Sequence, residues 1–382
     1  MLRRLDSLLM PVLIVAILIS LFILGRLSQS GFDFSSFVVA GDTFSKPARV
    51  PRSLTVLKES AGYDGQFYYR LALNPLTSQV TEFGITLDIP AYRHQRILYP
   101  LLTWVLSLGN ANLVPIIMVL INFFSLCVMG WIGGAYAQSL KQHALWGVFL
   151  PLYPGFLFTL SRDLVEILEV TLLLGSLLLI RRGKPVAATL LLALAVLTKE
   201  TAFLVAVAAL LVYVFKLRKS KDAGTLRWYY FAVPMAVLFF WQMVLFYNWG
   251  AFPYAGSDNI GIPFVGPAGF LSDMAALQTP FQRRTFIELT FLIGFTFCVL
   301  YHLRSTAASL HEMVSCLLYA ALAVSLNRFV WVEDWGFFRA VSQSYALGTM
   351  IIIASSFKSK AFVFGYSQLF WIYIVGVILW KW

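Results

Sequence analysis

The chain has 382 residues, of which 59% are hydrophobic and only 12% are charged. This composition excludes an ordinary soluble globular protein, and several apolar stretches reach the roughly 20 residues needed to cross a membrane. The formal net charge of +11 does not indicate nucleic-acid binding, because the basic residues form short clusters between apolar stretches, as in cytoplasmic loops that contact anionic lipids. We therefore expect an all-α polytopic membrane protein, with residues 1–382 forming a single integral membrane domain surrounded by membrane lipids.

The first apolar stretch, residues 8–27, follows Arg3 and Arg4 and lacks a small-residue cleavage site. It is predicted to be a retained signal-anchor helix with the N-terminus in the cytoplasm. Residues 28–96 follow as a long, charge-mixed outer loop, and loops of this length usually carry a function. Within it, Asp64 is placed to cap a short helix from Gln66 to Leu73, which Asn74-Pro75 would end.

The remaining chain divides into a helix bundle (97–249), a Gly/Pro-rich outer loop (250–285) and C-terminal spans (286–382). Residues 97–108 are apolar but too short to span, so we expect an interfacial or re-entrant helix on the outer side. Further spans are predicted at 113–136, 144–160, 164–180, 186–198, 201–216, 228–249, 286–303, 311–330, 342–357 and 361–380. With eleven spans, the clusters at Lys141, Arg181, Lys216, Arg304 and Lys358 lie on the side of the N-terminus, and the C-terminus lies outside.

The polar stretch around Asp64 is the first candidate site. A carboxylate there would serve as a general base or as a metal ligand, and its alternative role is the helix cap described above. Tyr63 and Tyr68 are placed to stack on a sugar or to line a groove, although aromatic residues are also common at membrane interfaces. Gln66 and Arg70 belong to the same stretch and are included as candidate substrate-binding residues.

A second group of charges begins the span predicted at 164–180. Asp163, Glu166 and Glu169 would form an acidic strip on one helix, with Arg162 beside it. Charges at membrane depth are costly unless they are paired or face a polar cavity. The strip therefore indicates either a substrate or metal site between helices or an internal ion pair that supports the bundle.

Further charged residues on the outer face are candidates for phosphate binding. Lys199 and Glu200 lie between two apolar stretches, where Lys199 would bind a lipid phosphate as a point charge or both residues would simply pair with neighbours. The run Arg93, His94, Gln95, Arg96 precedes Tyr99-Pro100, and its arginines run against the positive-inside pattern. Arginine matches phosphate geometry, and contact with lipid headgroups is the alternative. The same alternatives apply to Arg328 and Arg339 near the last outer loop, where Asp334 is also included as a candidate substrate-binding residue.

Several catalytic patterns are missing from the sequence. The four histidines show no metal-ligand spacing, and no phosphate-binding P-loop, dinucleotide-binding glycine motif or HExxH motif occurs. Nucleotide-driven pumping and zinc-dependent hydrolysis are therefore not expected. No cofactor is required by the sequence, although Asp64, Asp163 and Glu166 would suit a divalent cation if they met.

Four elements, taken in order, resemble the GT-C superfamily of membrane glycosyltransferases, and most closely its GPI mannosyltransferase 2 group. Residues 63–72 stand where that group has a Trp-Asp-x-x-x-Tyr element, and residues 96–102 contain its Tyr-Pro-Leu element. Residues 161–166 resemble a Ser-Glu-containing helix start, and residues 181–201 its basic loop and Leu-Thr-Lys segment. The likeness covers residues 1–215, with Tyr63 in place of the Trp and no paired Asp-Asp in the outer loop.

This resemblance implies a GT-C-like bundle of about eleven transmembrane helices with a long first extracytoplasmic loop that contains short helices. It implies transfer of a sugar from a polyprenyl-phosphate donor to a lipid-linked or cell-surface glycan acceptor at the outer face of a bacterial cytoplasmic membrane. Asp64 would be the general base, and outer arginines and lysines would stabilise the departing phosphate. Two other functions stay open: a lipid-linked glycan flippase or secondary transporter, and a non-catalytic scaffold in a polysaccharide-assembly complex.

Overall fold

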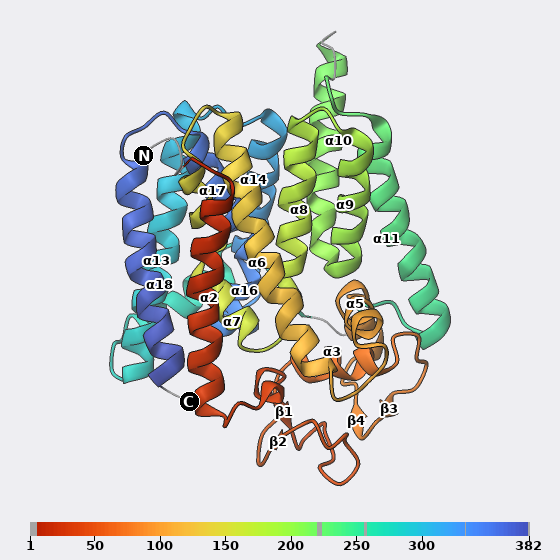
Figure 1. Ribbon diagram of the computed structural model, residues 1–382. Coiled ribbons are helices and arrows are strands. Elements are labelled where there is room, and N and C mark those ends of the chain that lie inside the picture. The colour runs from red at the N-terminus through yellow and green to blue at the C-terminus, as the bar shows by residue number, and fades with distance from the viewer. Residues whose placement is uncertain (1–5, 220–223, 256–257, 333, 381–382) are drawn as a thin grey trace.

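The computed structural model describes residues 6–219, 224–255, 258–332 and 334–380. Most of this part of the chain is helical, and the long helices run side by side along one direction (Figure 1). Six helical stretches in it are long and apolar enough to cross a membrane. They are α2 (Leu9–Gln29), α6 (Val114–Ser139), η3 with α10 (Glu200–Ala202 and Phe203–Arg218), α11 (Trp228–Trp249), α13 with η4 (Pro280–His302 and Leu303–Ser305) and α18 (Lys360–Trp380).

Shorter helices fill the space between these six. α8 packs against both α6 and α9, and α14 packs against both α10 and α17. The expectation of a mainly helical membrane protein is confirmed. The count of about eleven spans stays a prediction, because the remaining helices after α6 are shorter than a membrane-spanning length. They are η2 (Ala144–Phe149), α7 (Pro154–Leu160), α8 (Glu166–Arg181), α9 (Pro185–Thr198), α12 (Val265–Met274), α14 (Leu310–Val324), α15 (Arg328–Trp331), α16 (Asp334–Ala340) and α17 (Ser342–Ala354).

Two of the predicted spans are wrong as continuous helices. Residues 144–160 form the short η2 and α7, because Pro151 and Pro154 interrupt the helix and remove backbone donors. The two pieces instead pack against α6 and α16, respectively. Residues 311–330 are likewise split, since α14 ends at Val324 and α15 begins at Arg328. The break at Pro151–Pro154 is buried, whereas the break before α15 leaves Arg328 exposed.

Residues 28–96, which keep the name outer loop after their predicted side, contain short elements that gather at one end of the bundle, the lower end in Figure 1. They are η1 (Phe34–Phe37), β1 (Ala40–Gly41), β2 (Val56–Leu57), α3 (Gly65–Leu73), β3 (Thr81–Glu82), β4 (Ile85–Thr86) and α4 (Pro90–His94), followed by α5 (Leu98–Ser107). β1 pairs with β2 in parallel, and β3 pairs with β4 antiparallel. The helix predicted at 66–73 is thus confirmed, as is a short helix at 97–108.

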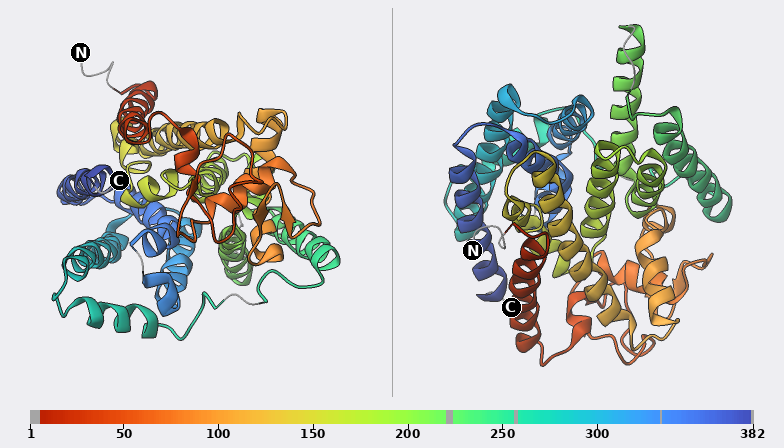
Figure 2. Two further views of the ribbon diagram at one scale, coloured as in Figure 1. Left: turned by 90° about the horizontal axis from the view of Figure 1, so that it is seen from below. Right: turned by 45° about the horizontal axis from the view of Figure 1, so that its top comes forward.

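The two ends of the bundle differ in their chemistry. At the upper end, Arg181 pairs with Glu312, and Lys360 reaches Gln142. The Gln138 amide also donates to the Asp6 carbonyl at this end, so the basic loops gather where the chain begins. At the lower end, the Asn248 amide donates to the Thr77 carbonyl and ties α11 to the outer loop. Viewed from that end, the loop covers one half of the bundle and leaves the C-terminal helices on the other side (Figure 2).

Candidate functional site

The turn that carries Asp64 packs directly on the turn between α7 and α8. A Cβ atom added at Gly65 would overlap the carbonyl oxygens of Arg162 and Val38, so this close approach requires glycine. Asp64 occupies the N-cap position of α3, but its side chain makes no capping hydrogen bond. The capping role predicted for Asp64 is therefore wrong, and its carboxylate is used elsewhere.

The Asp64 carboxylate lies between two guanidinium groups. Its Oδ1 is 2.9 Å from Nη1 of Arg93, and its Oδ2 is 2.6 Å from Nη1 of Arg339 in α16. Arg93 is fixed by further contacts: its Nε and Nη2 donate to Asp88 at 2.8 and 2.6 Å, and its guanidinium lies 4.5 Å from the Phe67 ring centroid. The outer loop and the C-terminal part of the chain thus meet at one carboxylate.

The charges around Asp64 determine its protonation state. Burial alone would raise the pKa of Asp64, but the guanidinium groups of Arg93 and Arg339 outweigh burial and hold the pKa far below its usual range. Asp64 is therefore ionised at neutral pH and is a weak base while both arginines remain in contact with it.

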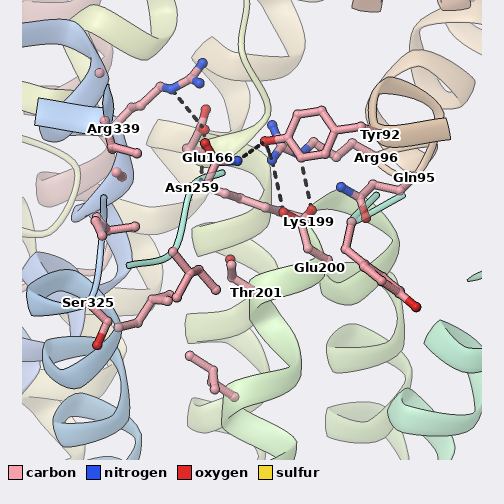
Figure 3. A pocket seen from close by; sticks show the side chains of 18 of the residues that line it. Tyr92, Gln95, Arg96, Glu166, Lys199, Glu200, Thr201, Asn259, Ser325 and Arg339 are labelled. Atoms are coloured by element: carbon pink, nitrogen blue, oxygen red, sulfur yellow. Dashed lines mark hydrogen bonds and ion pairs between the residues drawn. The ribbon is translucent and has the colours of Figure 1, made fainter. Parts of the chain in front are cut away.

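A pocket of about 880 Å³ lies beside this carboxylate. Its charged end contains five ionisable side chains, which come from α4–α5, α8, α9–η3 and α16: Arg96, Glu166, Lys199, Glu200 and Arg339. Its other walls are apolar and come mainly from α10, α14 and α15: Phe203, Leu204, Leu318, Leu322, Leu326, Phe329 and Val330. Figure 3 shows Glu166 and Lys199 between Arg339 on one side and Arg96 on the other. Asp64 does not line the pocket and lies behind Arg339.

The charged residues of the pocket are paired with one another. Lys199 Nζ lies 3.2 Å from Glu166 Oε1, and Arg339 Nε lies 4.0 Å from the same oxygen. Arg96 binds Glu200 through two nitrogens, at 3.2 and 3.0 Å. Lys199 and Glu200, although adjacent in sequence, therefore pair with different partners. Three of these five side chains are buried: Glu166 is 1% exposed, Arg96 3% and Lys199 7%.

Aromatic side chains surround these charges. Arg96 donates to the hydroxyl groups of Tyr68 (2.9 Å) and Tyr92 (2.8 Å). The Tyr63 ring lies between two cations, 5.4 Å from the Arg162 guanidinium and 5.2 Å from that of Arg339. Tyr63 also lines the pocket, as the sequence predicted for a groove-lining residue.

The acidic strip is only partly present as predicted. α8 begins at Glu166, so Glu166 and Glu169 share a helix but Asp163 does not. Asp163 lies in the preceding turn at a φ of 46°, fully buried, and does not line the pocket. Glu169 is also fully buried and accepts a hydrogen bond from the Gln343 amide at 2.8 Å. Glu166 is therefore the member of the strip that reaches the pocket.

Other candidates from the sequence lie outside the pocket lining, in contacts that organise the outer loop. The Gln66 carboxamide accepts from the Gly41 amide and the Ser45 hydroxyl, and Arg70 contacts Thr77, Gln79 and Glu82. The Tyr99 hydroxyl donates to the Met118 carbonyl. His94 binds the Pro75 carbonyl through Nε2 and accepts from the Trp249 indole at Nδ1. The guanidinium carbon of Arg162 lies 4.2 Å from the centroid of the Trp335 ring.

Several pocket residues had no signal in the sequence. Tyr92 adjoins the charged run 93–96 and could have been included with it, and its hydroxyl accepts from Asn259 at 3.2 Å. The apolar walls from α14 and α15 look like any lipid-facing helix in sequence. Asp334 begins α16, but its side chain lies outside the part of the chain that the structure describes. Among the described residues, no group of three or more His, Cys, Asp or Glu side chains is arranged to hold a metal ion.

Comparison with known proteins finds no match to any family model and no match to a curated protein.

Proposed function

We propose that this protein is a membrane glycosyltransferase of the GT-C type that takes its sugar from a polyprenyl-phosphate donor. The observation that supports this most is the pocket, in which a charged end with Arg96, Lys199 and Arg339 continues into apolar walls. A phosphate suits the cationic groups, and a prenyl chain suits the walls. One pocket thus offers both environments that a lipid phosphate needs.

The proposed reaction is a single displacement. An acceptor hydroxyl loses its proton to Asp64 as its oxygen forms a bond to the anomeric carbon of the sugar. The bond between that carbon and the phosphate oxygen breaks, and the polyprenyl phosphate leaves with the electron pair. Arg339, which contacts Asp64 and lines the pocket, would stabilise the charge that develops on the leaving phosphate. The acceptor would be a lipid-linked or cell-surface glycan.

We also propose which side of the membrane the pocket faces. The pocket belongs to the end of the bundle that carries the outer loop, whereas the basic clusters gather at the other end. Under the positive-inside rule the basic end faces the cytoplasm. In a bacterial cytoplasmic membrane the pocket would then face the periplasm, where polyprenyl-phosphate sugars are consumed.

Transfer can be tested before the sugar is identified. Proteoliposomes would be given a panel of polyprenyl-phosphate hexoses and pentoses with a cell-envelope glycan extract as acceptor, and release of free polyprenyl phosphate would be measured. We expect acceptor-dependent release by the wild type, and a loss of at least about 100-fold in Asp64→Asn, the scale of general-base catalysis. Transfer by Asp64→Asn at the wild-type rate would remove Asp64 from the mechanism.

The same vesicles test the alternative of transport. Buried carboxylates such as Glu169 within a bundle are also a feature of ion-coupled carriers. Movement of a labelled lipid-linked glycan across the bilayer, without release of polyprenyl phosphate, would favour a flippase or secondary transporter over the transferase.

A further inference from the structure

The charges around the pocket are balanced before any ligand binds. Each cation of the group has a carboxylate partner: Arg93 and Arg339 with Asp64, Arg93 also with Asp88, Lys199 with Glu166, and Arg96 with Glu200. An incoming phosphate must therefore take a cation from a carboxylate that already holds it. The question is which pair opens at the lowest cost.

Arg339 has the most exposed side chain of these cations. Its side chain is 20% exposed, compared with 11% for Arg93, 9% for Lys199 and 4% for Arg96. Arg93 is held by Asp88 as well as Asp64 but does not line the pocket. Arg96 is held by Glu200 and two tyrosine hydroxyl groups. Arg339 lines the pocket, has one short contact to Asp64, and lies at 4.0 Å from Glu166.

We propose that Arg339 is shared between Asp64 and the phosphate of the ligand, so that phosphate binding releases Asp64 from one of its two guanidinium partners. This inference rests on the proposed function, because it assumes a phosphate-bearing ligand in the pocket. A guanidinium binds phosphate through two parallel hydrogen bonds, which its single short contact with Asp64 does not provide. Asp64 becomes a stronger base only when the donor phosphate has drawn Arg339 toward the pocket.

The coupling is reciprocal, as any thermodynamic linkage must be. If phosphate competes with Asp64 for Arg339, removing the Asp64 charge must strengthen phosphate binding. A residue that only supports the fold would weaken binding or leave it unchanged when it is substituted. The direction of the change in affinity therefore distinguishes sharing from a structural role.

The test uses the full-length protein in detergent and geranyl phosphate, a short prenyl monophosphate, with affinity measured by titration calorimetry. Asp64→Asn should bind the probe at least about fivefold more tightly than the wild type, the lower end of typical coupling. Arg339→Gln should weaken binding, and the double variant should bind like Arg339→Gln alone. Glu82→Gln is the matched control, because it removes one negative charge from the same loop, paired with Arg70 and outside the pocket lining. Its affinity should stay at the wild-type value.

The outcomes separate this inference from the proposed function. If geranyl phosphate does not bind the wild type, the lipid-phosphate donor class fails and the inference fails with it. If the wild type binds but Asp64→Asn does not bind more tightly, or if the double variant keeps the gain, only the sharing of Arg339 is overturned. Asp64→Ser removes the same charge and carries the same expectation if Asp64→Asn does not give monodisperse protein.

Discussion

Buried polar residues at the lower end of the molecule fall into two groups, according to what they contact. One group surrounds the pocket, where each charge is paired with another pocket residue or with Asp64. The other group holds the outer loop to the bundle, and His94 is its clearest member. His94 is 2% exposed, with Nε2 at 2.7 Å from the Pro75 carbonyl and Nδ1 accepting from Trp249 in α11. The Trp249 bond requires Nδ1 to be unprotonated, so the imidazole is neutral.

The neutral state of His94 leads to a prediction about stability and pH. Burial, reinforced by the charge of Arg70, lowers the pKa of His94 from 6.5 to about 4. Because the unfolded chain takes up the proton first as the pH falls, stability is full above about 6.5 and is lost toward pH 4. We expect the uptake of a proton by His94 in the unfolded chain to make the free energy of unfolding about 2 kcal/mol lower near pH 5 than at pH 7. Thermal unfolding in detergent at both pH values should show this loss in the wild type.

Two variants show whether His94 causes the acid sensitivity. His94→Gln should be less stable than the wild type at pH 7 but should lose less stability on acidification. His143→Gln, a histidine substitution in the turn before η2 at the opposite end, is the control. An identical acid response in His94→Gln would mean that other groups are responsible.

At the scale of elements, the site depends on how two turns fit together. The α3 helix follows from local sequence, since Asn74-Pro75 ends it where expected. The contact between the turn at Gly65 and the turn at Arg162 does not, because these residues lie far apart in the chain and no local pattern relates them. This contact places Asp64 close to the start of α8. Arg339, which belongs to α16, reaches the same carboxylate.

Substitution of Gly65 tests this arrangement. Gly65→Ala should lower the free energy of unfolding by about 1–3 kcal/mol, the usual cost of overpacking, because its methyl group would meet the carbonyl oxygens of Arg162 and Val38. Gly294→Ala in α13 is the matched control, because a Cβ atom there has nothing within 4 Å. Helix propensity predicts that this variant is as stable as the wild type or more so, and an equal loss in both variants would contradict the close-packing argument.

For the whole molecule, the sequence predicts much of the fold and a smaller part of the site. Hydropathy identifies the long spans because a bilayer demands length and apolar character, and both can be read locally. The breaks at Pro151 and at residues 325–327 were missed, because short buried helices have the same composition as spans. The pairing of Asp64 with Arg339 joins positions 275 residues apart, and the apolar walls come from helices with no distinguishing pattern. Sequence thus identified most of the charges, and only the fold shows which of them meet.

The difference between the two ends of the bundle leads to a prediction about its orientation in the membrane. Lys58 lies exposed in the outer loop, and Lys184 lies exposed in the basic loop between α8 and α9. If the basic end faces the cytoplasm, Lys58→Cys should react with a membrane-impermeant maleimide in bacterial spheroplasts that express the protein, whereas Lys184→Cys should react only after the membrane is permeabilised. The native cysteines Cys127 and Cys316 are buried and Cys298 is half-buried, so the wild type measures the background. Labelling in the reverse order would place the pocket on the cytoplasmic side, where a donor displayed on the outer leaflet could not reach Arg339, and the proposed direction of transfer would fall with it.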